Sequence, residues 1–327
     1  MRKVYISFLL LFLALGGSYF YDQNAKQSTQ KPTVAIMQFV THPALDAIHT
    51  GIIDELKKEG FVDKKNINID FQNAQADQSN LKTIANKFAE SNPAVSVGIA
   101  TPAAISIANT ITKSPVIFSA STNPVVSGLI KNVKEPEGNV TGVSDQAPIA
   151  GQIKLMQEII PDLKTVGVIY TSSDDSANTE ATRFQELATK VGIKVKMFSI
   201  TNTNDLNQTA NQMVCDSSIQ AVFVGTDNTI ASAFPTLIAA TDSKNIPVFP
   251  TVDTMVKQGG VAADSINQHN LGIQTGKQIA QILKGKKVSQ IPVVFQKSGD
   301  IVINLKQAQK LGLSIPEKIQ KSAKEVY

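Results

Sequence analysis

Cysteine is almost absent from this chain of 327 residues, in which Cys215 is the only one. A single cysteine cannot form an intramolecular disulfide, and it cannot supply the paired thiolates of a CxxC metal or redox site. Cys215 ends a helical pattern at residues 211–215 (NQMVC). We therefore expect a small buried side chain at this position rather than a reactive thiol.

Net charge is also low. The formal charge is +4, and three basic residues against one acidic residue in the first thirty contribute +2 of it, which leaves +2 for the rest. Lysines alternate with acids, as in residues 54–59 (DELKKE), which is typical of a solvated helix face. A nucleic-acid-binding protein would show a clustered basic face instead, so we expect no nucleic-acid partner.

Motifs of nucleotide-binding and hydrolytic enzymes are missing as well. The chain has no G-x-G-x-x-G after a strand pattern, no G-x-x-x-x-G-K-[ST], no G-x-S-x-G and no H-E-x-x-H. His42 and His49 could share a helix face, but a zinc site needs a third ligand and His269 is distant in the sequence. We therefore expect no enzymatic activity, no metal site and no cofactor.

An uncharged apolar run follows the basic start of the chain. Residues 4–21 (VYISFLLLFLALGGSYFY) come directly after Arg2 and Lys3, a combination typical of a secretory signal or a membrane anchor. As a helix this run would measure about 27 Å, close to the thickness of a hydrocarbon core. Cleavage after the small residues 16–18 (GGS) and an uncleaved anchor both remain open, whereas lipid anchoring through a cysteine is excluded. We expect an extracytoplasmic protein that is secreted or anchored at the cell surface.

The rest of the chain contains two series of alternating strand and helix patterns. The first predicts strands at residues 33–39, 67–71 and 95–100 with helices at 45–59 and 80–90, and the second predicts strands at 165–170, 195–200 and 221–225 with helices at 177–191 and 206–215. In each series the first helix ends near a glycine, Gly60 or Gly192, which suits a left-handed helix C-cap. The alternation predicts an α/β protein with two similar Rossmann-like lobes, each with a parallel sheet, facing each other across a cleft.

Ligands of such sheets bind beyond the carboxyl ends of the strands, where loops meet helix N-termini. We therefore predict ligand contacts in these loops and where the chain crosses between lobes, at Asp145 and Asp264. The complete set of candidates is Gln38, Phe39, His42, Thr101, Ser119, Ser121, Asn123, Asp145, Tyr170, Ser172, Ser173, Thr226, Asp227, Thr251 and Asp264. A structural alternative remains open for several of them, since Asp227 and the hydroxyls are common helix N-caps, and Phe39 and Tyr170 could pack in the core.

Four segments occur in a characteristic order: residues 139–145 (NVTGVSD), 226–229 (TDNT), 303–306 (INLK) and 310–312 (KLG). Together they resemble the substrate-binding protein family of ABC importers typified by members that bind tryptophan and other aromatic amino acids. The similarity extends over residues 32–315.

The resemblance implies a type 1 periplasmic-binding-protein fold with three crossover strands. The first lobe would comprise residues 31–145 and 268–297, and the second residues 146–267 and 298–327, after a signal or anchor segment and tether at residues 1–30. One departure from the family pattern is Ser176-Ala177, where relatives tend to have Asn-Ser.

The resemblance also implies a function. The chain would bind a small solute, most favourably an aromatic amino acid such as tryptophan, and deliver it to a membrane permease that is driven by a cytoplasmic ATPase. We expect a monomer. The alternatives are a ligand-binding sensor domain and an importer component for another small polar solute, such as a different amino acid, a sugar or a nucleoside.

A free amino acid needs hydrogen-bond donors for its carboxylate, an anion for its ammonium group and an apolar surface for its side chain. Our hypothesis assigns the carboxylate to hydroxyls among Thr101, Ser119, Ser121 and Ser172 with adjacent helix N-termini. It assigns the ammonium group to Asp145, Asp227 or Asp264. It places the aromatic side chain of the ligand against the rings of Phe39, Tyr170 and His42.

Overall fold

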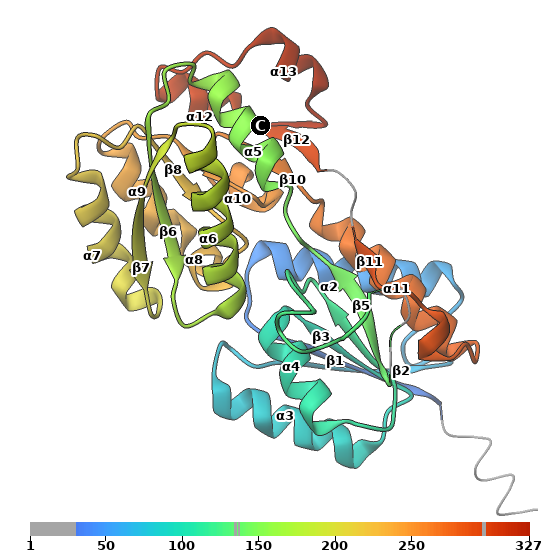
Figure 1. Cartoon of the computed structure of the whole chain (residues 1–327). Helices are drawn as coiled ribbons and strands as arrows, with labels where there is room; N and C mark the ends of the chain where they lie inside the picture. Colours follow the sequence, from blue (N-terminus) through green and yellow to red (C-terminus); the bar gives the residue numbers. More distant parts are fainter. Residues whose placement is uncertain (1–30, 134–135, 137, 296–298) are drawn as a thin grey trace, which may run out of the picture.

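The computed structural model describes residues 31–133, 136, 138–295 and 299–327, which form two α/β lobes (Figure 1). The predicted signal or anchor segment and tether at residues 1–30 lie outside these residues. Among the helices in the described part of the chain, none is long and apolar enough to cross a membrane.

The first lobe is built on a six-stranded sheet in the order β11-β5-β4-β3-β1-β2, with every neighbouring pair parallel. Its strands are β1 (Thr33–Gln38), β2 (Asn68–Asn73), β3 (Val95–Ile99), β4 (Val116–Ser119), β5 (Val140–Ser144) and β11 (Val294–Phe295). The helices that belong to it are α2 (Pro43–Lys58), α3 (Gln78–Ser91), α4 (Thr101–Thr110) and α11 (Gln268–Leu283), with a 3-10 turn η1 (Val288–Gln290).

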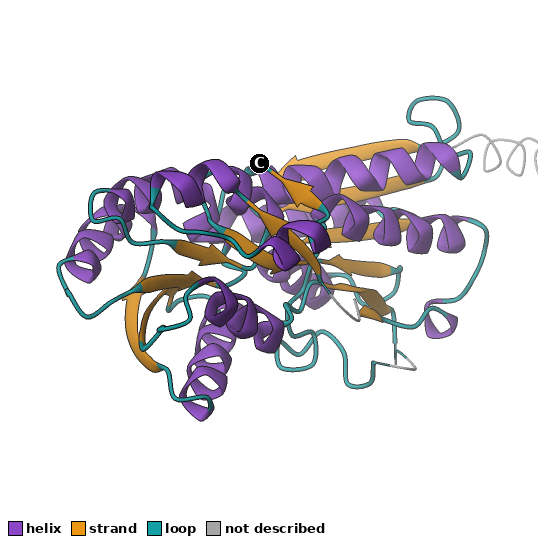
Figure 2. Cartoon of the chain, turned by 90° about the horizontal axis from the view of Figure 1, so that it is seen from above, coloured by secondary structure: helices purple, strands orange, loops and turns teal. Residues whose placement is uncertain are grey.

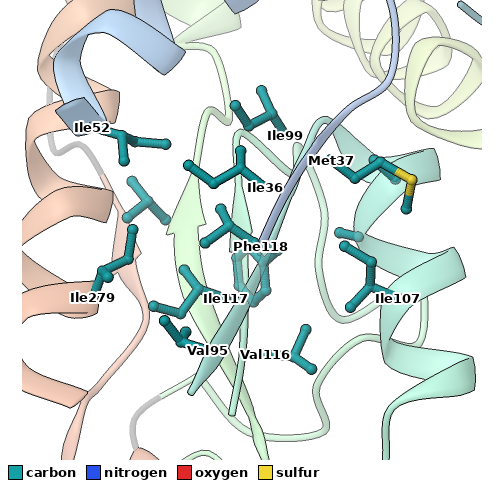
Figure 3. Close-up of a cluster of buried hydrophobic side chains, with 14 of the residues drawn as sticks. Ile36, Met37, Ile52, Val95, Ile99, Ile107, Val116, Ile117, Phe118 and Ile279 are labelled. Atoms are coloured by element: carbon teal, nitrogen blue, oxygen red, sulfur yellow. The ribbon is translucent and has the colours of Figure 1, made fainter. Parts of the chain in front are cut away.

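The central strands of this sheet are covered on both faces, which explains their nearly continuous apolar sequences. Figure 3 shows Phe118 of β4 in the middle of the cluster, with Ile52 of α2 and Ile279 of α11 on one side and Ile107 of α4 on the other. All four of these side chains are fully buried. The core thus fixes the ends of the strands, which carry the loops of the site.

The second lobe contains a parallel sheet in the order β7-β6-β8-β9, the same order as β2-β1-β3-β4 of the first lobe. The strands are β6 (Thr165–Thr171), β7 (Lys194–Ile200), β8 (Ala221–Val224) and β9 (Val248–Pro250). A smaller sheet joins β10 (Ala262–Ser265), β12 (Asp300–Ile303) and β13 (Glu325–Val326). The helices are α5 (Ile149–Ile159), α6 (Asp175–Lys190), α7 (Thr203–Val214), α8 (Asn228–Ser232), α9 (Phe234–Asp242), α10 (Asp253–Lys257), α12 (Leu305–Lys310) and α13 (Glu317–Ser322).

Seen from above, helices lie on both sides of the strands (Figure 2). The shared strand order confirms the prediction of two similar α/β lobes, which the sequence indicated through its repeated pattern. Gly60 and Gly192 have φ angles of +89° and +84°, as expected for the left-handed residue after a helix.

The chain passes between the lobes three times. It leaves β5 at Ser144 for α5, returns from β10 at Ser265 to α11, and passes from β11 to β12 through residues 296–298, which lie outside the described part. These passages agree with three crossovers, while the residue-level boundaries of the lobes stay a prediction.

The expectation for Cys215 is wrong. Helix α7 ends at Val214, and Cys215 is its exposed C-cap residue. The buried face of the helix is completed by Met213 and Val214, so the next residue along the chain points away from the core.

Candidate ligand-binding site

The carboxyl ends of the strands in both lobes border a cleft of about 700 Å³. The apolar side chains that line this cleft come mainly from the first lobe and include Phe39, Leu81 and Ile105. The second lobe contributes only polar side chains: Thr171, Ser173, Asp174, Asp175, Ser176, Thr201, Asn202, Thr203, Asn228, Thr229 and Ser232. The first lobe also contributes polar side chains, among them Gln78, Lys82 and Asn109, so the cleft joins an apolar patch to polar groups, and its size fits a small amphipathic ligand.

The N-terminus of α4 enters the cleft without a side-chain cap. Ala100 occupies the N-cap position with φ +76°, and it has no side chain that can accept a hydrogen bond from the first turn. Helix α4 can start this close to β3 because Gly98 has no Cβ, which would lie 2.4 Å from Ala104 Cα. The uncapped helix start therefore presents free N–H groups, which favour an anion.

Three hydroxyl groups meet at this helix start. Thr101 Oγ1 lies 3.1 Å from Ser121 Oγ of the same lobe and accepts a hydrogen bond of 3.1 Å from Ser176 Oγ on α6 of the second lobe. All three side chains are buried. We call Thr101, Ser121 and Ser176 the hydroxyl trio; it joins the two lobes at the N-terminus of α4.

Asp227 has a structural role in the second lobe. Its carboxylate accepts hydrogen bonds from Thr229 N and Ile230 N at the start of α8, and from both N and Oγ1 of Thr171 at the end of β6. These four bonds use both oxygens of the carboxylate. The structure thus supports the N-cap alternative for this residue, and leaves it little capacity for a ligand.

Asp145, in contrast, has a free oxygen. It follows β5 at the first crossing, it is only 5% exposed, and its Oδ1 has no hydrogen-bond partner among the described residues. Burial raises the pKa of Asp145 to about 6, and the neighbouring Asp174 carboxylate adds to the effect. A buried carboxylate oxygen without a partner is costly for the protein, which points to a cationic group as its missing partner.

His42 forms a second link between the lobes. Its Nε2 lies 3.0 Å from Asn228 Oδ1 on α8, whereas its buried Nδ1 has no partner among the described residues. Burial lowers the pKa of His42, so the ring is neutral at neutral pH. A small cavity beside this link is lined by His42, Asp145, Thr226 and Asp227, among other residues.

The predicted contact residues fall into two groups. Those at the cleft or the small cavities beside it are Phe39, His42, Thr101, Ser121, Asn123, Asp145, Ser173, Thr226 and Asp227. Gln38 lies close by at the end of β1, with its buried Oε1 unpartnered among the described residues. Their contacts with a ligand stay a prediction.

The other predicted residues point elsewhere. The Ser119 hydroxyl lies 2.7 Å from Thr275 of α11, Tyr170 packs against the second-lobe core, and Ser172 is exposed and donates to Ile200 O. Thr251 Oγ1 lies 3.2 Å from Thr226 Oγ1. Asp264 is on β10 beside Gly151 and Gly299. The structure does not bring these five side chains to the cleft.

Sequence reasoning missed Ser176 and Glu180, two polar residues of α6 that the fold brings to or beside the cleft, whereas Asp174 and Asn228 belong to the predicted strand-end loops. A signal was present: Asp174 caps α6 through bonds to Ser176 N and Ala177 N, and an Asp before a helical pattern predicts such a start. A helix predicted to start after Asp174 would have placed Ser176 and Glu180, which are four residues apart, on the same face.

Comparison with known proteins identifies the family. The family model described as ABC transporter substrate binding protein matches residues 33–327. A curated relative, the tyrosine-binding protein of Clostridioides difficile strain R20291, is 33% identical over 289 residues, which cover 88% of this chain and 83% of the relative.

Solved structures agree with this assignment. The ABC domain in complex with L-Trp from Streptococcus pneumonia is 41% identical with a TM-score of 0.88, covering 91% of this chain and all of that one. A conserved domain protein from Vibrio cholerae is 33% identical with the same TM-score and the same coverage. The ligand-free, open structure of a substrate-binding protein with adhesive properties from Clostridium difficile is 35% identical, with coverages of 90% and 99% and a TM-score of 0.70.

The difference between these TM-scores does not follow sequence identity, since chains of 33% and 35% identity give 0.88 and 0.70. The lower score belongs to a structure described as ligand-free and open, and one of the higher scores to a complex with L-Trp. In this chain, hydrogen bonds join the two lobes at Thr101–Ser176 and His42–Asn228. On the family match and these similarities, the chain belongs to the ABC transporter substrate-binding protein family.

Proposed function

We propose that this substrate-binding protein captures an aromatic amino acid in the cleft between its lobes and delivers it to an ABC permease. The observation that carries the proposal is the combination, at the cleft and in a small cavity beside it, of an uncapped helix start with three hydroxyls, a buried carboxylate with an unpartnered oxygen and an apolar patch. These are the three partners that a zwitterion with an apolar side chain requires. The tyrosine-binding relative and the L-Trp complex support the same class of ligand.

The carboxylate of the amino acid would bind at the N-terminus of α4. Free backbone N–H groups and the positive end of the helix dipole favour an anion there, and the hydroxyl trio can turn its hydrogens toward it. Because Ser176 belongs to the second lobe and Thr101 to the first, a carboxylate between them would hold the lobes together. Binding would in this way favour the closed arrangement.

The ammonium group would bind at Asp145. Of the three carboxylates predicted from the sequence, Asp227 is saturated by hydrogen bonds, Asp264 lies away from the cleft, and Asp145 keeps a free buried oxygen. Asp145 is coupled to the first lobe through the Thr122 hydroxyl, which neighbours Ser121 of the hydroxyl trio. The carboxylate and ammonium subsites therefore adjoin, as they must for an α-amino acid.

The side chain would lie along the apolar wall with Phe39, Leu81 and Ile105. An aromatic ring there could make offset or edge contacts with Phe39, worth roughly 0.5–1.5 kcal/mol beyond area burial. The cleft volume of about 700 Å³ accommodates a ring as large as an indole.

Other parts of the proposal follow from the family. The protein would act outside the cytoplasm by binding and release rather than by catalysis, with the permease and its ATPase as partners. Residues 4–21 would serve as signal or anchor, and the protein would work as a monomer.

The absence of tryptophan from the chain provides a direct test. Indole fluorescence in a mixture with the full-length protein would come only from added L-Trp. We expect a blue shift that saturates with protein concentration and that is reversed by competing L-Tyr or L-Phe. If neither a shift nor competition occurs, the aromatic assignment is wrong; competition by a sugar but not by amino acids would favour the alternative of a different polar solute.

A further inference from the structure

His42 occupies the N-cap position of α2 without capping the helix. Its backbone is extended, and its side chain makes no hydrogen bond to the first turn, which starts with Pro43. An N-cap residue is normally a Ser, Thr, Asp or Asn whose side chain bonds to the helix start. The His42 ring instead reaches the second lobe, where Nε2 lies 3.0 Å from Asn228 Oδ1. The ring is therefore held by the opposite lobe and not by its own helix.

The contact with Asn228 fixes which ring nitrogen of His42 carries the hydrogen. An amide oxygen can only accept a hydrogen bond, so Nε2 is the donor. Burial lowers the pKa of His42, so the ring is neutral at neutral pH and has a single N–H. Nδ1 is then a lone-pair acceptor, and it is buried with no hydrogen-bond partner among the described residues. His42 thus lacks a donor at Nδ1.

His42 shares a small cavity with Asp145. Both side chains line a space of about 10 Å³, close to what one water molecule needs, and a primary ammonium group has a similar size. Both residues are only 5% exposed. Asn228 lines this cavity and also the main cleft, so the cavity adjoins the space proposed for the amino acid.

The cavity has two unsatisfied acceptors and no cation. The other polar side chains of its described lining already form hydrogen bonds within the protein; they are Thr226, Asp227, Asn228 and Gln268. His42 Nδ1 and Asp145 Oδ1 are the two side-chain atoms of this described lining that are buried without a partner. Neither carries a hydrogen at neutral pH, and no lysine or arginine belongs to the described lining. The missing group is therefore a donor with a positive charge.

We infer that His42 is a specificity-determining residue of the ammonium site: Nδ1 accepts one N–H of the ligand's ammonium group while Asp145 Oδ1 accepts another. The inference rests on the proposed function, and it defines the ligands as α-amino acids with a primary ammonium group. Such a group satisfies both buried acceptors and balances the charge of Asp145. A methyl group on the nitrogen removes a donor and has no room in a cavity that fits one water molecule, so N-methylated amino acids are rejected.

A permanently bound water is the other group of the right size. If a water stays in the cavity with or without ligand, replacing His42 changes the affinity for every ligand to the same extent. A direct contact with the ammonium group makes the effect of the replacement depend on whether the ligand has that group. The two occupants are therefore distinguished by comparing L-Trp with indole-3-propionate, which lacks the ammonium group.

Calorimetric titration of the full-length wild type and His42→Gln with both ligands makes this comparison. Glutamine can place an amide N–H near the position of Nε2 and keep the link to Asn228, but it has no acceptor at the position of Nδ1. His42→Gln should weaken L-Trp binding about tenfold or more and leave indole-3-propionate binding unchanged. His269→Gln, a half-exposed position paired with Asp54 on the surface of the first lobe, is the matched control and should leave both affinities unchanged.

The outcomes separate this inference from the proposed function. An equal loss of affinity for both ligands in His42→Gln would overturn the inference, because the residue would then act through the lobe arrangement or a fixed water. Unchanged affinity for L-Trp would overturn it as well. Either result leaves the proposed function standing, whereas absence of heat with every aromatic amino acid in the wild type overturns both.

Two measurements on the wild type decide the matter even if the His42→Gln protein does not fold. N-methyl-L-tryptophan should bind about tenfold or more weakly than L-Trp, and equal binding would overturn the inference. The chain has only three histidines, so nitrogen NMR of protein labelled with ¹⁵N-histidine can follow His42. Saturating L-Trp, but not indole-3-propionate, should shift its Nδ1 resonance from the bare toward the hydrogen-bonded position. An Nδ1 resonance that L-Trp leaves unchanged would overturn the inference.

Discussion

Asp145→Asn is expected to stabilise the ligand-free protein while weakening ligand binding. The substitution keeps the shape of the side chain and removes a buried charge whose Oδ1 has no partner among the described residues. Because burial raises the folded-state pKa from 3.8 to about 6, the folded protein binds more protons than the unfolded chain between these values. Ionisation of Asp145 therefore leaves the free energy of unfolding unchanged below about pH 4, where the carboxyl is protonated in both states. Above about pH 6 the carboxyl is ionised in both states, and its burial lowers the free energy of unfolding by the full amount.

The magnitude follows from the size of this shift. A shift of about two pKa units corresponds to a loss of at most about 3 kcal/mol in the free energy of unfolding of the wild type at pH 8, and Asp145→Asn should regain this amount. For lobes of this size, that gain would raise the unfolding temperature by roughly 6–12 °C. The loss of one charge-assisted hydrogen bond to the ammonium group, about 1.5–3 kcal/mol, should weaken binding roughly 10- to 150-fold.

Thermal unfolding followed by circular dichroism at pH 4 and pH 8, together with calorimetric titration at pH 8, measures both effects. The stability gain should be present at pH 8 and absent at pH 4. Asp227→Asn is the matched control: burial raises the pKa of Asp227 to about 6 as well, but an amide nitrogen would face the Thr171 N–H that now donates to Asp227 Oδ2, so this variant should gain less stability at pH 8 than Asp145→Asn. The reasoning is refuted if Asp145→Asn destabilises the protein at pH 8 or leaves affinity unchanged.

Three further predictions concern the cleft and the packing beneath it. Thr101→Ala or Ser176→Ala should weaken amino acid binding about five- to tenfold in a calorimetric titration, whereas Ser172→Ala, whose exposed hydroxyl donates to Ile200 O away from the cleft, should not. Asn228→Ala removes the link to His42 and should expand the ligand-free protein in small-angle scattering; an unchanged radius of gyration would contradict its role in closure. Gly51→Ala places a Cβ 2.2 Å from His269 O, so it should force α2 and α11 apart and lower stability by about 2 kcal/mol or more in denaturant unfolding, and equal stability would show that the helices can yield.

Much of the fold could be predicted because strand and helix periodicity is local. The strands that begin at Thr33 and Thr165 are apolar runs of the kind that buried parallel strands require, and Gly60 and Gly192 mark the ends of the helices that follow. Helix ends were less accurate: α2 begins at Pro43 and α6 at Asp175, two residues before the predicted starts. Proline at the first turn and an Asp cap set these starts, and neither contributes to hydrophobic periodicity.

The site could be predicted only in part because its residues meet through tertiary structure. Thr101 and Ser121 were placed correctly near the cleft by the rule that ligands lie beyond strand ends, but the orientation of a side chain cannot be read from that rule. Ser119 shows the difference: it ends β4 and still points to Thr275 of α11, because side chains alternate along a strand. Ser176 and Glu180 became visible only when α6 was seen to face the other lobe.

The most direct test of the account is a calorimetric comparison of L-Trp with two analogues, tryptamine, which lacks the carboxylate, and indole-3-propionate, which lacks the ammonium group. With the full-length protein we predict saturable heat for L-Trp or another aromatic amino acid, and at least tenfold weaker binding of each analogue, since each leaves one charged subsite without a partner. Binding of both analogues as tightly as L-Trp, or no heat with any aromatic amino acid, would contradict the claim that this cleft recognises an amino acid by both of its charges.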